Sequence, residues 1–506
     1  MADYFEYLRL MIIRVLGDIG MFFVHVFATP WTYVPANFEV YGNYFAEHSP
    51  MFGFWGWFFF VFFLLLGIGL IGGLGYLLFV LARKYIRFVK KEIDKDELRQ
   101  QLERLNYELF VAVQEKDKIL NLKTQYLGLS DPSKMRPEDQ ETIEEINSRF
   151  SKLVVVDHQY SGKDMEIPPV DNLSLEELCN SFRHFAASQL HLYYTIDTIR
   201  QLFAGMGTSK LIILEGISGT GKTSLPYALG KFFNFDASIC PVQPSWRDRS
   251  ELLGYYNEFT KKFNESEFLR SLYVSTYRKD PNIIVLDEMN LARIEYYFAE
   301  FLSIMEMPNV NDWKIELIAN AANSDPKNLR DGKILIPQNV VFFGTANNDD
   351  STFTISDKVY DRAISLFFDN KGIPFDCEFQ ESMSIPYAQI SKLFDDAKNQ
   401  YPVSEKILEK FDELDKFVIK KFKLAFGNRI LKQMSSFIPV YVACGGTELA
   451  GLDFIFTNKI LKKFESLNIT FLKDELKELN QQLDKLFGKG TFPMAHDFID
   501  NLIKMN

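Results

Sequence analysis

Cysteine and histidine are scarce in this chain of 506 residues, which contains 4 cysteines and 6 histidines. The cysteines form no C-x-x-C pair and lie far apart, at Cys179, Cys240, Cys377 and Cys444. Close cysteine pairs are the usual mark of a disulfide scaffold or a zinc site, and the histidines show no metal-ligand spacing. The sequence therefore argues against both, and it predicts reduced core cysteines in a mainly cytoplasmic protein.

An excess of positive charge is also absent. Aspartate and glutamate outnumber lysine and arginine by 67 to 56, which gives a formal net charge of -11. The chain as a whole therefore offers no attraction for nucleic acid. A local basic patch is compatible with this balance, because the arrangement of charge decides binding. Nucleic acid stays an open partner at this point.

Charged side chains are missing altogether from His48 to Ala82. The most apolar part, residues 58–82, is long enough as a helix, at about 1.5 Å per residue, to cross a hydrocarbon layer of about 30 Å. A cleaved signal peptide would be shorter and closer to the N-terminus. We therefore predict a transmembrane helix within residues 51–82.

Lysine and arginine are placed unevenly around this predicted span. Residues 32–82 contain neither, whereas Arg83 and Arg87 follow the span directly. By the positive-inside rule the C-terminal side of the span is cytoplasmic. We therefore predict a protein of the inner (plasma) membrane of a bacterial cell, which contacts lipid. Residues 1–50 are predicted to be membrane-associated. Their apolar stretch 10–31 is interpreted either as a first transmembrane helix or as an interfacial amphipathic helix.

The chain after the span divides into four parts by composition. Residues 83–126 run from basic residues into a short heptad pattern, which predicts a helical stalk that is either a coiled coil between subunits or a single helix. Residues 127–170 are polar and proline-containing, and they predict a linker with a local helix at 137–150. Residues 171–372 alternate apolar strands with helical stretches, which predicts an α/β domain. Residues 373–506 are expected to form a helical lid and C-terminal helices.

Strands and one helix start can be placed within the α/β part. Ser174 and Glu177 match a capping box, which predicts a helical run from there to Phe203. Apolar strands separated by helices favour a parallel sheet covered on both faces. The five predicted strands are 211–214, 238–242, 283–287, 340–345 and 363–368.

A glycine-rich segment follows the first of these strands. It reads Gly216-Ile-Ser-Gly-Thr-Gly-Lys-Thr-Ser224 and fits the phosphate-binding pattern G-x-x-x-x-G-K-[ST]. Backbone N–H groups of such a loop bind phosphate oxygens, Lys222 reaches the terminal phosphates, and the Thr223 hydroxyl ligates Mg²⁺. The predicted nucleotide contacts are Gly216, Ser218, Gly219, Thr220, Gly221, Lys222, Thr223 and Ser224.

Polar groups suited to hydrolysis lie at the ends of two later strands and just before a third. The third strand ends in Asp287 and Glu288, where one carboxylate would hold the Mg²⁺ and the other would polarise the attacking water. Asn347 follows the fourth strand and is expected to position that water. Arg362 precedes the last strand, and we interpret it as a group at a subunit edge that stabilises transition-state charge in a neighbour's site.

These segments resemble the McrB-like branch of the AAA+ ATPases, related to the MoxR group. The resemblance rests on G-I-S-G-T-G-K-T, L-D-E-M-N-L-A-R, F-F-G-T-A-N-N-D and S-D-K-V-Y-D-R-A, and it covers roughly residues 171–450. It implies a P-loop AAA+ sheet with a helical lid, ATP or GTP with Mg²⁺ as cofactors, and self-assembly into a ring expected to have six subunits. An inserted hairpin, expected from similarity over 242–257, would project towards the ring pore.

The resemblance also implies roles for single residues. It matches Asp287 and Glu288 to the Walker B pair, Asn347 to the first sensor, Arg362 to the arginine finger and Arg429 to the second sensor. McrB itself continues after its first sensor with Thr-Ala-Asp-Arg, whereas Asn347 is followed here by Asn-Asp-Asp-Ser. The choice between ATP and GTP therefore stays open.

Three functions are compatible with the sequence. The first is a membrane-anchored ring NTPase that drives conformational work on an unidentified partner protein. The second is a restriction or antiphage defence subunit that recruits a McrC-like or nuclease partner, although the chain carries a membrane segment where a DNA-reading domain would be expected. The third is a membrane scaffold whose assembly is controlled by nucleotide.

Overall fold

The computed structural model describes residues 148–505, except for short gaps at 164, 218, 348–351 and 369–371, and scattered residues between 42 and 83. The chain separates into two compact units, Met1–Ala112 and Val113–Asn506. The predictions for the segment 10–31 and the stalk 83–126 lie outside the described residues, as does most of the predicted span 51–82. In the part of the chain that is described, no helix combines the length and apolar character that crossing a membrane requires.

The five predicted strands form one parallel sheet. Its spatial order is β10-β1-β9-β5-β2, with parallel pairing throughout. The strands are β1 (Leu211–Gly216), β2 (Ser238–Pro241), β5 (Asn282–Asp287), β9 (Val340–Asn347) and β10 (Ile364–Phe368). The predicted α/β class with a parallel sheet is therefore confirmed.

The sheet is buried on both faces because nearly every residue of its strands is apolar. Side chains alternate between faces along a strand, so Ile212 and Leu214 join one core while Leu211 and Ile213 join the other. The first core also contains residues of the helices α7 (Leu175–Leu190), α8 (Ile196–Met206) and α9 (Ser224–Phe232). The second contains residues of α11 (Glu267–Ser275), α12 (Ile294–Tyr297) and α13 (Ala299–Ile304).

The first helix of this layer begins where the capping box predicts. The Ser174 hydroxyl accepts from the Glu177 N–H at 3.2 Å, and the Glu177 carboxylate accepts from the Ser174 N–H at 2.9 Å. The helix is shorter than predicted, however. It ends at Leu190 because His191 adopts a left-handed conformation with φ 54°, and a second helix begins at Ile196.

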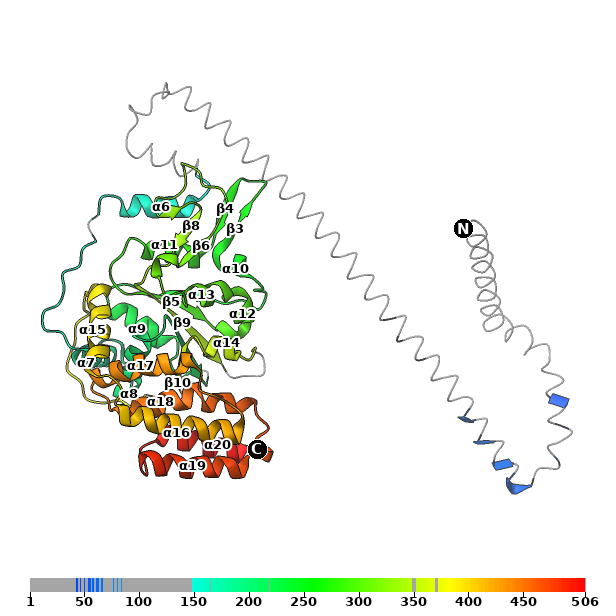
Figure 1. Ribbon diagram of the computed structural model, residues 1–506. Helices are drawn as coiled ribbons and strands as arrows, with labels where there is room; N and C mark the ends of the chain where they lie inside the picture. Colours follow the sequence, from blue (N-terminus) through cyan, green and yellow to red (C-terminus); the bar gives the residue numbers. More distant parts are fainter. Residues whose placement is uncertain are drawn as a thin grey trace, which may run out of the picture. The chain divides into compact units, whose positions relative to one another are not determined.

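Helices make up the C-terminal part, as the sequence predicts. Figure 1 shows α16 to α20 gathered at one end of the second unit. The long helices are α15 (Tyr387–Gln400), α16 (Glu405–Phe422), α17 (Asn428–Ala443), α18 (Glu448–Lys459), α19 (Lys473–Phe487) and α20 (Pro493–Met505). Their buried apolar residues belong to the same core as one face of the sheet, so the lid is packed onto the sheet.

A buried ion pair joins the lid to strand β1. Lys462, in the short helix η6 (Leu461–Ser466), contacts the carboxylate of Glu215 in β1. The two side chains are 9% and 0% exposed. The hydroxyl of Tyr360 donates to the same carboxylate oxygen at 3.1 Å. Glu215 directly precedes the glycine-rich loop, so this pair couples the lid to the loop's first residue.

Two small antiparallel sheets lie outside the main sheet. The first, called the inserted hairpin below, consists of β3 (Gly254–Asn257) and β4 (Lys262–Glu265), and it overlaps the stretch 242–257 only at residues 254–257. The second small sheet is not predicted from the sequence, and it has the order β6-β8-β7, from β6 (Lys314–Glu316), β7 (Leu329–Arg330) and β8 (Lys333–Leu335). Strands of two or three residues are too short to show an alternating pattern.

Helix α6 (Ser151–Tyr160) packs against the inserted hairpin within the region interpreted as a linker. The ring of Phe150 is fully buried and stacks on Phe263 at 4.9 Å. The buried carboxylate of Glu265 accepts from the backbone N–H groups of Lys152 and Leu153, each at 2.9 Å. Residues 148–160 therefore belong to the folded unit.

The second small sheet is tied to the start of α6 as well. The guanidinium of Arg149 binds both carboxylate oxygens of Asp325, at 3.0 and 2.7 Å. Asp325 lies in the loop between β6 and β7. In Figure 1, α6 lies at the same end of the unit as both small sheets. This short helix therefore connects two β-hairpin elements that are distant in sequence.

The lid should make stability dependent on pH through Asp453. This side chain in α18 is 1% exposed and accepts from the N–H groups of Met494 and Ala495, each at 2.9 Å. Burial raises its pKa to about 6 from an ordinary 3.8. Because the folded protein then holds the proton more tightly, stability should decrease by about 3 kcal/mol as the pH rises from 4 to 6, and then level off.

Melting temperatures of the wild type and Asp453→Asn between pH 4 and pH 7 check this expectation. Asparagine does not titrate, so the stability of the variant relative to the wild type should rise across that interval. A difference that stays constant with pH would contradict the assignment to Asp453.

Candidate functional site

The glycine-rich loop has the backbone that its sequence requires. Gly216 has φ 139°, and a Cβ atom there would lie 2.2 Å from the Phe368 carbonyl oxygen. Gly219 and Gly221 have φ 81° and 90°. Side chains strongly disfavour such values, so glycine is needed for the chain to turn from β1 into α9. Ser218 lies outside the described residues.

Lys222 is turned back towards its own loop. Its ammonium donates to the carbonyl oxygens of Gly216 and Ile217 at 2.9 and 2.8 Å, and the residue is only 6% exposed. Burial lowers the pKa of Lys222, and the charges of Asp287 and Glu288 act in the opposite direction. The cation is thus held over the loop, where an anionic ligand would compensate its burial.

A hydroxyl–carboxylate–hydroxyl contact joins the loop to two neighbouring strands. Thr223, the residue before α9, donates from its Oγ1 to Oδ1 of Asp287 at 2.8 Å. Thr345 in β9 donates to the same oxygen, also at 2.8 Å. Hydroxyl and carboxylate oxygens are the ligands that Mg²⁺ prefers, so Thr223 and Asp287 fit a magnesium ion.

Glu288 and Asn347 lie at the same edge of the sheet. The Glu288 N–H donates to Thr345 Oγ1 at 2.8 Å, and Glu288 itself is left-handed, with φ 53°, and exposed. In the strand register Asn347 pairs with Gly216. The structure therefore brings the loop, both carboxylates and the asparagine to the carboxyl ends of β1, β5 and β9.

Asn290 fixes the end of β9, which gives this residue a role that its motif leaves unexplained. Its side chain is 3% exposed and donates to the Asn347 carbonyl at 2.9 Å. A second contact runs to the Phe353 carbonyl at 3.3 Å. Asn290 thereby connects the turn after β5 to the residues on both sides of the gap at 348–351.

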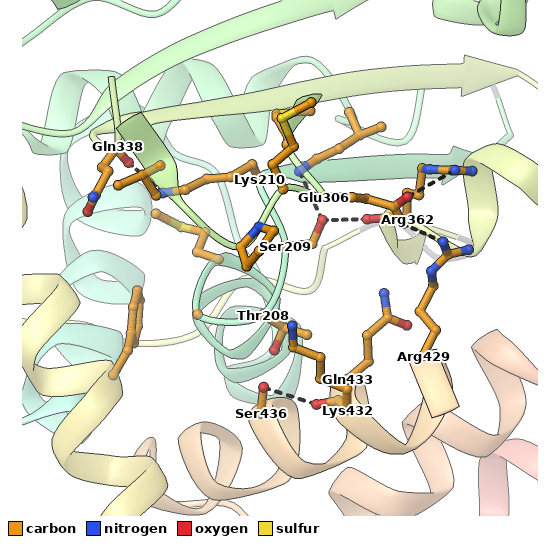
Figure 2. A pocket seen from close by; sticks show the side chains of 18 of the residues that line it. Thr208, Ser209, Lys210, Glu306, Gln338, Arg362, Arg429, Lys432, Gln433 and Ser436 are labelled. Carbon is orange, nitrogen blue, oxygen red and sulfur yellow. Dashed lines mark hydrogen bonds and ion pairs between the residues drawn. The ribbon is translucent and has the colours of Figure 1, made fainter. Parts of the chain in front are cut away.

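The two candidate arginines lie together at the opposite end of the sheet. Arg362 and Arg429 line a cavity of about 670 Å³ that also contains Leu211, the first residue of β1 (Figure 2). Gly216 lies five residues further along this strand, or about 16 Å away. Both arginines therefore lie near the start of β1, whereas the glycine-rich loop follows its end.

Lys210 is half-buried in the lining of the same cavity. Its ammonium donates to the Gln338 carbonyl and to the Tyr387 hydroxyl, each at 2.5 Å. Burial lowers its pKa to about 7, and nearby Lys398 contributes in the same direction. Lys210 is therefore a weaker source of positive charge at neutral pH than the two arginines.

Comparison with known proteins finds similarity only among solved structures. No protein-family model and no curated protein matches this chain. It is similar to a candidate ATPase from Cytophaga hutchinsonii, with 13% identity and a TM-score of 0.41, over 66% of this chain and 96% of that one. It is also similar to a full-length MCM homolog from Methanopyrus kandleri, with 10% identity and a TM-score of 0.34, over 58% of this chain and 62% of that one.

Both similarities are remote. They carry no functional argument, and the function proposed below rests on the residues of the site. The chain spans less than two thirds of the MCM homolog's length.

Sequence reasoning missed two residues of importance here. Thr345 lies within the motif F-F-G-T-A-N-N-D, two residues before Asn347 on the same face of β9. This spacing could have indicated a second hydrogen-bond donor to Asp287. Glu306 belongs to no recognised motif, yet it contacts both arginines of the cavity. No sequence signal marks Glu306.

Proposed function

We propose that this chain is an AAA+ NTP hydrolase of the McrB-like branch that works as a ring of identical subunits. The observation that supports it most is the contact of the phosphate-loop Thr223 with the strand-end Asp287 at 2.8 Å. A phosphate loop alone indicates binding of an anion. Its contact with a carboxylate pair indicates that the ligand is a nucleotide whose terminal phosphate is attacked by an activated water molecule.

The residues of the site divide the work of hydrolysis. Loop N–H groups and Lys222 would bind the phosphates, while Thr223 and Asp287 would hold Mg²⁺. When bound, Mg²⁺ neutralises charge on the phosphates. Glu288, exposed beside Asp287, would accept a proton from the attacking water, and Asn347 would orient that water.

The arginines would complete the site of a neighbouring subunit. About 16 Å of strand separates Arg362 and Arg429 from their own phosphate loop, so they could act on hydrolysis only if another copy presents its nucleotide to them. A repeated head-to-tail contact of this kind closes into a ring, for which we propose six subunits. The second-sensor role proposed for Arg429 would then also be exercised between subunits.

Mixing two inactive variants tests this composite site. Lys222→Ala should lose phosphate binding, and Arg362→Ala should lose the charge that it donates to a neighbour. In a mixture of equal amounts, roughly a quarter of the interfaces would pair an intact loop with an intact arginine. We expect phosphate release to recover to about that fraction of wild type. No recovery, with assembly shown by sedimentation, would contradict a shared site.

We further propose that residues 51–82 anchor the ring in a membrane, with residues 10–31 as a second membrane segment. The described residues between 54 and 66 support this, since they are helical and expose large apolar side chains such as Trp55 and Leu65. The full-length chain should float with lipid vesicles and resist alkaline extraction. Release by alkali would refute the anchor.

The ring is proposed to act on a partner protein through its inserted hairpin. The hairpin exposes two aromatic side chains, Tyr255 and Phe259, which are 51% and 73% accessible.

Two measurements test hydrolysis and the partner. The rates of phosphate release from ATP and from GTP by the wild type show whether the chain hydrolyses nucleotide and which base it prefers. Affinity purification with Glu288→Gln then tests the partner, and recovery of a nuclease would favour a defence role.

A further inference from the structure

A single carboxylate lies between the two arginines of the cavity. Oε2 of Glu306 is 3.0 Å from Nη2 of Arg362, and Oε1 is 2.6 Å from Nη2 of Arg429. Figure 2 shows Glu306 between the two guanidinium groups, with the contacts drawn as dashed lines. Each carboxylate oxygen therefore serves a different arginine.

The three side chains come from separate parts of the fold. Glu306 follows α13, Arg362 follows α14 (Asp357–Tyr360), and Arg429 lies in the first turn of the lid helix α17. Two guanidinium groups repel each other at short distance, and a carboxylate between them offsets this repulsion. The planar fork of arginine also takes a fixed orientation on a carboxylate. Glu306 thus sets the spacing and direction of both cations.

The surrounding charges leave the cluster attractive to an anion. Asp361 approaches Arg429 at 3.9 Å and Lys463 at 2.8 Å. Three cations and two carboxylates give a net charge of +1. The arginine side chains are 23% and 44% exposed, so a phosphate could reach them without displacing protein atoms that cover them.

We infer that Glu306 is a positioning residue that holds Arg362 and Arg429 as a pair facing the nucleotide of the neighbouring subunit. The inference rests on the proposed function. Partly exposed ion pairs contribute little to folding stability, typically below about 1 kcal/mol. The main effect of Glu306 is therefore expected in catalysis, where misplacing a reacting group by about 1 Å costs up to roughly 100-fold in rate.

Steady-state hydrolysis by Glu306→Gln tests this role. Glutamine keeps the size of the side chain and removes the charge that aligns the arginines. We expect kcat to fall by about 10- to 100-fold, with KM within about twofold of wild type, because the arginines act on transition-state charge. Glu300→Gln is the matched control, since Glu300 in α13 makes an exposed ion pair with Arg249, and its kcat should not change.

A background without either guanidinium separates positioning from a structural role. When Arg362 and Arg429 are both replaced by lysine, the compact ammonium groups need no fork alignment, so adding Glu306→Gln should lower kcat by less than about twofold. An equal loss in both backgrounds, an unchanged kcat or an increased kcat in Glu306→Gln would each overturn the inference while leaving the hydrolase intact. Absence of hydrolysis by the wild type would overturn the proposed function and this inference together.

Discussion

Replacing Glu288 with glutamine is expected to lower the rate of nucleotide hydrolysis by about 10²- to 10⁴-fold, the contribution typical of a general base. Glutamine is similar in size and leaves the N–H contact to Thr345 in place. The phosphate loop and the Thr223–Asp287 contact are unchanged as well, so nucleotide should still bind. The result would be a chain that holds its nucleotide without hydrolysing it.

Two measurements on the same protein check this expectation. Phosphate release gives kcat, and titration with a fluorescent nucleotide gives the dissociation constant. Glu316→Gln serves as the control, because Glu316 is an exposed residue of β6 paired with Lys333. Unchanged kcat in Glu288→Gln would remove Glu288 from the mechanism. Loss of binding with loss of rate would indicate that the substitution disturbs the loop.

The second large effect is expected in stability, from Lys462→Met. This change leaves the fully buried carboxylate of Glu215 without its cation. Removing one partner of a buried pair typically costs 3–5 kcal/mol, because the other charge stays in a medium that solvates it poorly. The melting temperature should therefore fall by several degrees or more.

Two companion variants show whether the lost charge is responsible. Lys477→Met breaks an exposed pair with Asp474, and its melting temperature should change little. The double variant Glu215→Leu with Lys462→Met removes both charges and should recover most of the lost stability, because apolar replacements of buried pairs are often close to neutral. If Lys462→Met melts like Lys477→Met, the pair does not hold the lid.

The sheet and much of its functional edge could be predicted because they depend on local patterns. Each strand is a short apolar run, and polar residues directly follow β1, β5 and β9. Parallel strands place such residues at one edge, so Lys222, Asp287 and Asn347 were expected near one another. The same reasoning found the capping box at Ser174, which depends on residues three positions apart.

Features that depend on tertiary packing were predicted poorly. Arg429 was expected within the lid, and its position beside Arg362 at the far end of β1 results from helix packing that the sequence does not reveal. Helix α6 was interpreted as part of a linker because its polar and proline-containing surroundings outweighed Phe150 and its neighbouring valines. Glu306 gave no signal, since its importance comes from two partners that are more than 50 residues away.

The attachment of α6 decides where the chain can be shortened. A fragment that began at residue 171 would lack Phe150, which stacks on Phe263. It would also leave the buried Glu265 carboxylate without its two N–H donors. Such a fragment would expose an apolar surface and would tend to aggregate. A fragment that begins just ahead of Ser148 keeps these contacts. It is therefore the shortened form to purify for every assay that does not need a membrane.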